Sequence, residues 1–394
     1  MQVIPPARLD ELRASYEALV ERQHKIWAGD LEWDEPVAMD YKSKQPRIVL
    51  PAVVDAATAE TVEFCLHENT LGGSQQVMRV PEAAPTSMFF MCNPETDHGP
   101  DGWHRDFSPK RQGPLRGIQE DMLANGAPGY VQWNIPLYDD NVLWVVPGSH
   151  RRINTEQENR ELQQNPRGPL SGGLQVELNA GDGVVYSNMI LHWPSDYSTK
   201  LRRTIHLGYR SFGGKLFSYS SHFYWNLGFT KHLSPATRAR FERFAHLDAQ
   251  ERHLIESIFR AMLAKDASTF RTGLTTLHPG EMGRMAAVVL LSKKASTIRQ
   301  LKEPEVAGLP LNERAKVVGD QRTSLYLIED LARRFSPEEA DLLCQRFEPL
   351  DRKLQADSEQ YVPGFQAGPM QYVYNDMPAN FEVEDFIASW DESA

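Results

Sequence analysis

Eight short segments between residues 76 and 209 share a β-strand pattern. They are rich in Val, Ile, Tyr, Phe and Trp, and Gly, Pro, Asn or Asp separate them. The segments are residues 76–80, 87–92, 103–107, 129–136, 143–146, 174–178, 183–188 and 203–209. Many short strands at close spacing are typical of a β-sandwich or jelly roll. The pattern therefore predicts a β core of this kind in the middle of the chain.

Apolar residues recur at helical spacing on both sides of this core. They predict helices over residues 7–27 and 57–69. After Ser234-Pro235 the period of the apolar residues lengthens from two to about 3.6, which predicts a run of further helices. One of these opens with the capping box Ser336-Pro337-Glu338-Glu339. We divide the chain into an N-terminal helical segment (1–45), a β core (46–230) and a helical C-terminal extension (231–394) packed on the core. Within the extension, residues 364–377 are expected to return toward the mouth of the β core.

Composition narrows the class of protein. No apolar run among the 394 residues approaches the roughly 18 residues of a membrane span, so we expect a cytoplasmic protein without membrane partners. The net charge of −11 disfavours nucleic acid as a partner. Cys65, Cys92 and Cys344 lie far apart, which favours reduced thiols over a disulfide framework or a zinc cage. A small-molecule ligand remains the expected partner, and the helical region could join copies of the chain in a homo-oligomer.

The segment Trp103 to Phe107 offers a metal-binding pair. In an extended strand, side chains two residues apart emerge on the same face, so His104 and Asp106 can converge on one ion. A second histidine would complete the two-His, one-carboxylate face of non-haem Fe(II) oxygenases, which leaves positions open for substrates. His246 and Asp248 have the same spacing, but they lie in a predicted helix, where such a pair diverges.

The stretch from residue 141 to residue 210 supplies further candidates. Gly181-Asp182-Gly183 is a tight turn before an apolar strand, and His192 lies just beyond that strand, where a β scaffold can hold it rigidly. Arg203 follows eleven residues later on the next predicted strand. A guanidinium near the metal could bind the carboxylate of a co-substrate through two parallel hydrogen bonds.

This ordered set resembles the phytanoyl-CoA dioxygenase-like (PhyH-type) family of Fe(II)/2-oxoglutarate-dependent oxygenases. The order is H-x-D, a V-P-G-S-H turn at residues 146–150, G-D-x-V-x-Y at residues 181–186, then His and Arg, and it covers roughly residues 45–212. The resemblance implies a double-stranded β-helix (jelly roll, cupin-like) core in a mixed α and β chain. It implies His104, Asp106 and His192 as iron ligands and catalytic residues, Arg203 as the anchor for the distal carboxylate of 2-oxoglutarate, and O₂ as the oxidant.

One position departs from the family pattern. Members commonly place a serine two residues after the distal histidine, where it assists the arginine, and this chain has Pro194 there. Ser195, Ser198 or Thr204 could supply the missing hydroxyl to 2-oxoglutarate.

The strand that follows His192 offers two arginines, and only one can face the cavity. Arg202 and Arg203 point to opposite faces of a strand, and the family spacing selects Arg203, with Ile205 and Leu207 on the same inward face. Arg202, Thr204 and His206 should then face away from the cavity.

The function predicted from the sequence is hydroxylation of a small organic metabolite with release of succinate and CO₂. Asp106 favours hydroxylation over halogenation, because the halogenating relatives have a small residue in its place. Two alternatives stay open. One is a catalytically silent β-helix protein that binds a metal or ligand and contacts a partner through its helical half, which Pro194 would suit. The other is a metal-dependent hydrolase or isomerase on a cupin-like barrel.

Overall fold

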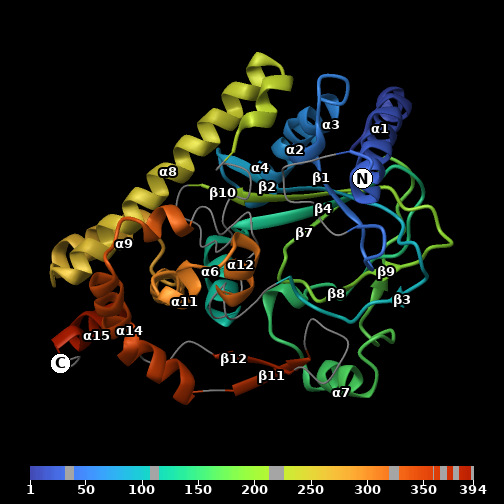
Figure 1. Cartoon of the computed structure of the whole chain (residues 1–394). Coiled ribbons are helices and arrows are strands. Elements are labelled where there is room, and N and C mark those ends of the chain that lie inside the picture. The colour runs from blue at the N-terminus through green and yellow to red at the C-terminus, as the bar shows by residue number, and fades with distance from the viewer. Residues whose placement is uncertain are drawn as a thin grey trace.

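The computed structural model describes residues 1–31, 40–106, 115–212, 226–318, 328–357, 359–363, 371–375 and 381–391. In this part of the chain, antiparallel sheets follow an N-terminal helical layer, and the C-terminal half is mainly helical (Figure 1). No described helix is both long and apolar enough to span a membrane.

The largest sheet has five antiparallel strands in the order β1-β2-β10-β4-β7. They are β1 (Arg47–Val49), β2 (Ala83–Met91), β10 (Thr204–Ser211), β4 (Tyr130–Pro136) and β7 (Val184–Tyr186). Strand β10 is central, since β2 and β4 pair with its two edges and not with each other. Pairing in the middle of the sheet therefore depends on β10, which is the last of the five strands of this sheet along the sequence.

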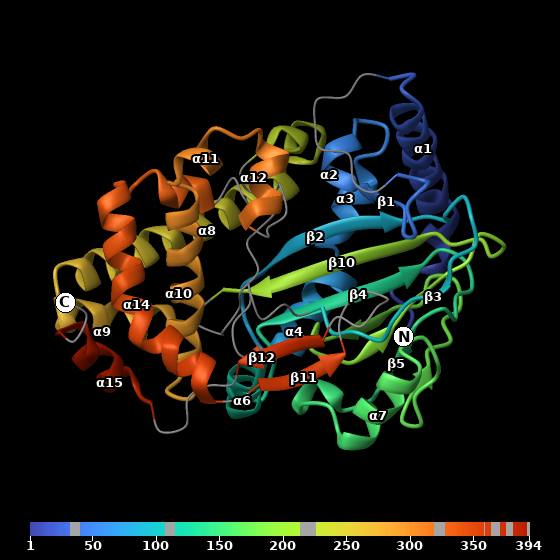
Figure 2. The same cartoon turned by 60° about the horizontal axis from the view of Figure 1, so that its bottom comes forward.

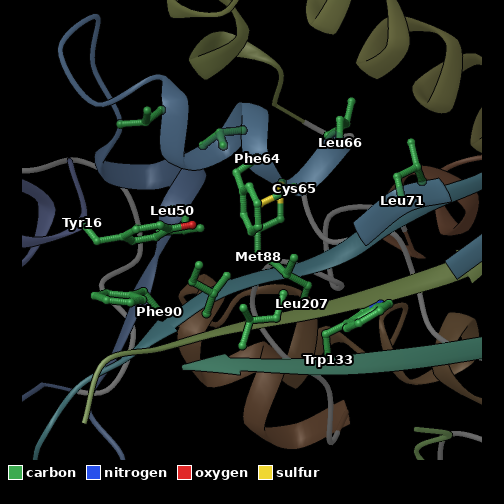
Figure 3. Packing of buried hydrophobic residues seen from close by; sticks show 14 of the residues in the cluster. Tyr16, Leu50, Phe64, Cys65, Leu66, Leu71, Met88, Phe90, Trp133 and Leu207 are labelled. Carbon is green, nitrogen blue, oxygen red and sulfur yellow. The ribbon is translucent and has the colours of Figure 1, made fainter. Parts of the chain in front are cut away.

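Helices cover one face of this sheet. They are α1 (Leu9–Ala28), α2 (Leu50–Val53), α3 (Glu60–Glu63) and α4 (Gly73–Met78). Alternate residues of β10, namely Ile205, Leu207 and Tyr209, are fully buried against this layer, and Tyr16 of α1 stacks on Phe90 of β2 (Figure 3). Because strand side chains alternate, the neighbouring residues of β10 face the opposite side of the sheet.

Shorter strands lie on that opposite side. A three-stranded antiparallel sheet has the order β6-β5-β8, and a separate pair joins β3 to β9. Their bounds are β5 (Trp144–Val145), β6 (Leu174–Gln175), β8 (His192–Trp193), β3 (Gly99–Pro100) and β9 (Ser195–Asp196). A helix, α7 (Glu156–Gln164), begins at a capping box between Thr155 and Glu158 and lies beside these strands.

Most helices of the C-terminal half contribute to one apolar cluster, to which α11 adds no residue. The principal ones are α8 (Pro235–Leu263), α9 (Ala267–Leu277), α10 (Arg284–Gln300), α11 (Pro304–Ala307), α12 (Leu311–Val318), α14 (Pro337–Asp357) and α15 (Val383–Ala388). The predicted capping box is confirmed, since Ser336 accepts from Glu339 N and Glu339 accepts from Ser336 N. Helix α8 is capped by Ser234, whose Oγ accepts from Thr237 N. Helix α6 (Leu115–Asn125) and Met189, which both precede residue 231, belong to the same cluster, so the cluster reaches into the β core.

A hairpin near the C-terminus, β11 (Glu359–Pro363) and β12 (Gln371–Asn375), lies beside α7 (Figure 2). Strand β12 thus returns to the side of the molecule that carries the smaller strands. The rest of the segment 364–377, for which such a return was expected, lies outside the described residues.

Two strand predictions are wrong. A strand was expected over residues 76–80, but residues 73–78 form helix α4. The helix packs against Trp133, whose Nε1 donates to Ser74 Oγ at 2.8 Å. In the segment 103–107, His104 makes a single β-bridge and Asp106 lies in a bend, so no continuous strand forms there, and Phe107 lies outside the described residues.

Candidate metal centre

His104 and His192 are paired through their main chains. His104 N donates to His192 O, and His192 N donates to His104 O, both at 2.9 Å. In an antiparallel pair, opposite residues project to the same side. The two imidazoles accordingly lie close together, with ring centroids 4.4 Å apart.

Each imidazole is held by the carbonyl two residues before it. His104 Nδ1 donates to Gly102 O at 2.8 Å, and His192 Nδ1 donates to Ile190 O at 3.0 Å. A hydrogen bond of this kind fixes the ring orientation and places the proton on Nδ1. In both rings Nε2 is then the nitrogen able to bind a metal.

Asp106 lies between the two Nε2 atoms. Its Oδ1 is 3.6 Å from His104 Nε2, and its Oδ2 is 3.3 Å from His192 Nε2. Its main chain is fixed by Asn188, which accepts from Asp106 N at 2.9 Å and donates its side-chain amide to Asp106 O at 3.0 Å. Gln132 Nε2 donates to Asp106 Oδ2 at 2.6 Å. The carboxylate therefore has a defined position although the segment around it is not a regular strand.

Burial and charge act in opposite directions in this cluster. Burial by itself raises the pKa of Asp106, but the adjacent His192 and His104 hold that pKa well below its usual range. Burial lowers the pKa of His104, and the hydrogen bond and charge of Asp106 raise it above its ordinary value overall. The arrangement thus keeps the carboxylate anionic, as a metal ligand must be.

The three side chains fit a divalent metal. One ligand atom from each of His104, Asp106 and His192 lies within 4.8 Å of the others. Two imidazole nitrogens and one carboxylate oxygen are the donor set of non-haem Fe(II) sites that keep positions open. The three residues singled out from the sequence thus lie together, and their role as metal ligands stays a prediction; the described residues contain no other such group.

Arg105 supports the centre from between two of the candidate ligands. The side chain is buried, and its guanidinium donates to Ser149 O at 2.7 Å, to Met189 O, and to Asn154 Oδ1 at 2.8 Å. Ser149 Oγ in turn accepts from Leu191 N at 2.8 Å. The turn at residues 147–150 therefore joins the segments that carry His104 and His192.

The face of the five-stranded sheet opposite the helices carries polar side chains close to the cluster. Tyr186 of β7 accepts from Asn134 Nδ2 at 3.3 Å, and Asn134 Oδ1 accepts from His206 Nδ1 at 2.7 Å. Burial, followed by the charge of Arg47, lowers the pKa of His206 to about 3, so this imidazole is neutral at physiological pH. The sheet thus offers neutral hydrogen-bonding groups beside the three candidate ligands.

Two arginines lie on this polar face. Arg47 of β1 is within electrostatic range of Asp106 and Tyr186, and Arg202 is within electrostatic range of Tyr186 and His206. Arg202 is buried, with Nη1 3.1 Å from Asp196 Oδ1. In both arginines Nε is buried and has no hydrogen-bond partner, although Arg202 Nε lies 3.9 Å from Asp140 Oδ2. A carboxylate bound here would supply a hydrogen-bond acceptor to these two Nε atoms.

The prediction that Arg203 faces the cavity together with Ile205 and Leu207 is wrong. Arg203 Nε donates to Glu17 Oε1 of α1 at 2.8 Å, and Nη1 donates to Asn93 Oδ1 at 3.2 Å, on the helix-covered side of the sheet. Arg202 lies on the side of the metal cluster. The register was misjudged because the apolar residues Ile205 and Leu207 were assigned to the cavity, whereas they pack against the helices.

The structure shows the surroundings of the proposed hydroxyl donors Ser195 and Thr204. Thr204 Oγ1 donates to Asp140 Oδ2 at 3.4 Å, and Ser195 is buried in β9, which pairs with β3. Pro194, at the usual serine position, offers only its carbonyl, which accepts from Asp101 N at 3.0 Å. Ser195 and Thr204 remain predictions as 2-oxoglutarate contacts.

Gln132, Tyr186 and Arg47 were not identified from the sequence. A signal was present for Gln132, because polar residues alternate with Val131 and Trp133 in β4 and such alternation indicates a strand with one polar face. Arg47 had no comparable signal, since its neighbours along the chain do not show which face of β1 meets the metal cluster.

A model of the phytanoyl-CoA dioxygenase family, PhyH, matches residues 1–204. No curated protein matches the chain by sequence. Similar solved structures include AviO1 from Streptomyces viridochromogenes Tue57, with 22% identity and a TM-score of 0.37 over 53% of this chain and 87% of that chain. HygX from Streptomyces hygroscopicus, with nickel and 2-oxoglutarate bound, shows 16% identity and a TM-score of 0.36 over 55% and 83% of the two chains. EctD from S. alaskensis, with 2-oxoglutarate and 5-hydroxyectoine, shows 13% identity and a TM-score of 0.37 over 53% and 69%.

Proposed function

The chain belongs to the phytanoyl-CoA dioxygenase (PhyH) family, and on this basis we propose that it is an Fe(II)- and 2-oxoglutarate-dependent dioxygenase that hydroxylates a small organic metabolite. The observation that carries the proposal is the cluster of His104, Asp106 and His192, whose ligand atoms lie within 4.8 Å of one another. The family match includes all three residues.

The reaction balances without a further reductant. One atom of O₂ enters the substrate as a hydroxyl, the other enters 2-oxoglutarate, and the latter leaves as succinate and CO₂. Bound Fe(II) would supply the activation of O₂. The protein's own part is to hold the metal through the Nε2 atoms of His104 and His192 and the Asp106 carboxylate, with both rings already oriented by their Nδ1 hydrogen bonds. Asp106 also supports hydroxylation over halogenation, because a carboxylate at this position occupies the place that a halide would need.

Arg202 is the proposed anchor for the distal carboxylate of 2-oxoglutarate, with Arg47 beside it. Both lie on the polar face of the sheet, both have an Nε without a hydrogen-bond partner, and a guanidinium can bind a carboxylate through two parallel hydrogen bonds. Arg203, which the family spacing favoured, is engaged by Glu17 on the other face. The anchor therefore moves by one residue along the same segment.

A double-stranded β-helix core over residues 46–230 is part of the proposal. The chain passes back and forth between two antiparallel sheets: β4 lies in the large sheet, β5 and β6 in the small one, β7 in the large one, β8 in the small one and β10 in the large one, while β9 pairs with β3. Such alternation is typical of jelly rolls. The extension 231–394 would close one side of this core, since its apolar cluster includes Met189, three residues before His192.

The test is anaerobic spectroscopy of the purified protein. Fe(II) together with 2-oxoglutarate should give the weak visible charge-transfer band of a chelate, and omission of either component should abolish the band. Succinate release across a panel of small metabolites would then identify the substrate.

The same experiment separates the alternatives. A protein that binds Fe(II) but shows no band and releases no succinate would be a silent metal- or ligand-binding scaffold, which Pro194 would suit. Turnover that continues without 2-oxoglutarate would indicate a metal-dependent hydrolase or isomerase.

A further inference from the structure

Polar side chains from three strands lie along the large sheet close to Asp106. His206 of β10 lies directly opposite Asn134 of β4, and Gln132 of β4 lies directly opposite Tyr186 of β7. His206 Nδ1 donates to Asn134 Oδ1 at 2.7 Å, and Asn134 Nδ2 donates to the Tyr186 hydroxyl at 3.3 Å. Gln132 Nε2 donates to Asp106 Oδ2 at 2.6 Å, so Gln132 is the member of this group that contacts the candidate metal ligand.

The hydrogen-bond directions are fixed by the chemistry of these groups. The ionised carboxylate of Asp106 only accepts hydrogen bonds, so Gln132 must turn its amide nitrogen, and not its oxygen, to Oδ2. Asn134 turns its nitrogen to Tyr186 and its oxygen to His206, so the neutral imidazole carries its proton on Nδ1.

We propose that Gln132 is a positioning residue that holds Oδ2 of Asp106, so that the carboxylate presents a single oxygen, Oδ1, to the metal. The inference rests on the proposed function, because it concerns the same metal centre. Gln132 is suited to this role since it is 2% exposed and belongs to a paired central region of the sheet, next to β10.

The orientation of Asp106 matters for the number of open metal positions. A carboxylate can bind a metal through one oxygen or two, and 2-oxoglutarate and O₂ together need the three positions that two histidines and one carboxylate oxygen leave open. A second bond from Asp106 would occupy one of these positions. By engaging Oδ2, Gln132 would prevent this.

The experiment compares metal binding in three variants. Gln132→Met removes the donor at nearly constant volume, and Gln132→Asn keeps an amide but withdraws it from Asp106. Gln119→Met is the matched control, because Gln119 is also a buried glutamine with one hydrogen bond, to Arg152 O at 2.8 Å, and is not among the metal-site residues. Each protein is titrated anaerobically with Co(II), and its Fe(II)–2-oxoglutarate band and metal-free thermal midpoint are recorded.

We expect both Gln132 variants to weaken Co(II) binding about 10- to 100-fold, the range usual for loss of a hydrogen bond to a metal ligand. Their charge-transfer band should shift or weaken, whereas Gln119→Met should match the wild type in both readouts. A purely structural role would lower the thermal midpoint and leave the band position of the loaded protein unchanged.

Unchanged Co(II) affinity in Gln132→Asn would overturn the inference, whether or not Gln132→Met folds. If the wild type itself binds neither Co(II) nor Fe(II), the proposed function fails. If the wild type binds and the Gln132 variants bind equally well, only the inference fails.

Discussion

His104 and His192 exchange two main-chain hydrogen bonds of 2.9 Å, so the two imidazoles are paired by the backbone itself. The two partners come from segments separated by 87 residues, and Nδ1 of each ring is bonded to a carbonyl two residues earlier. Ligands that are oriented before the metal arrives lose little freedom on binding. The centre is therefore preorganised by main-chain contacts that side-chain substitutions leave in place.

His192→Ala should abolish metal binding and preserve the fold. The substitution removes one of three ligands and leaves the main-chain bonds to His104 intact, so we expect Co(II) affinity to fall by more than about a hundredfold, beyond the loss seen for outer hydrogen bonds. Anaerobic Co(II) titration and circular dichroism measure the two effects. His246→Ala, from the other H-x-D pair, is the control and should bind Co(II) normally, since His246 is exposed on α8. Tight binding by His192→Ala would remove His192 from the centre.

Arg202→Lys should raise the 2-oxoglutarate concentration needed for half-maximal turnover about 10- to 100-fold, because the ammonium keeps the charge and loses the bidentate geometry worth roughly 1.5–3 kcal/mol. Arg203→Lys is the matched control and should change that concentration little, since Arg203 contacts Glu17 and Asn93 on the other face. Succinate release at varied 2-oxoglutarate provides the measurement. The opposite ranking would restore Arg203 as the anchor.

Arg105→Met should destabilise the metal-free protein. The buried guanidinium donates to two carbonyls and to Asn154, and its loss leaves these acceptors unsatisfied, at a cost of about 2–4 kcal/mol in the free energy of unfolding. Urea denaturation measures the change. The exposed Arg151, which follows the turn that Arg105 contacts, is the control, and Arg151→Met should stay within about 0.5 kcal/mol of the wild type. Equal effects of the two substitutions would contradict the role assigned to Arg105.

Glu158→Gln should give a stability difference that depends on pH. Burial raises the pKa of Glu158, but the hydrogen bonds from Arg152 and from Thr155 N outweigh it and hold the pKa below the ordinary value of 4.5. A lowered carboxyl pKa stabilises the fold above the unfolded pKa, and this contribution disappears as the pH falls through the folded pKa. We expect the variant to be less stable by about 1–2 kcal/mol at pH 7, with the gap closing below about pH 4. Urea denaturation at several pH values checks this, and a gap that stays constant to pH 3.5 would contradict it.

The three candidate ligands could be selected from the sequence because the selection depends on chemistry and on order along the chain. His104, Asp106 and His192 lie close together in the structure, helix α8 begins at Pro235, and α14 begins at the predicted capping box of Ser336 and Glu339. These features are local or tied to a recognisable family order, so one sequence is enough to specify them.

The sequence does not show which residues of β10 point to which face of the sheet, because this depends on what covers each side of the sheet. Ile205 and Leu207 are buried as expected, but they are buried beneath α1 to α4 and not in the cavity. A strand with both faces covered shows no exposed side to orient it, and a shift of one residue exchanges Arg202 and Arg203. Helix α4 was likewise missed, since residues 73–78 have weak helical periodicity and are fixed by contacts such as Ser74 with Trp133.

The position of β10 has a consequence for synthesis of the chain. Strands β2 and β4 emerge from the ribosome first, but one edge of each has no hydrogen-bonded partner strand until β10 is synthesised. At about 5–20 residues per second, β10 follows β2 by on the order of ten seconds. During that interval both strands expose unpaired edges that can pair with another nascent chain. Nascent chains that stall before residue 211 should therefore be the ones that chaperones bind and that aggregate.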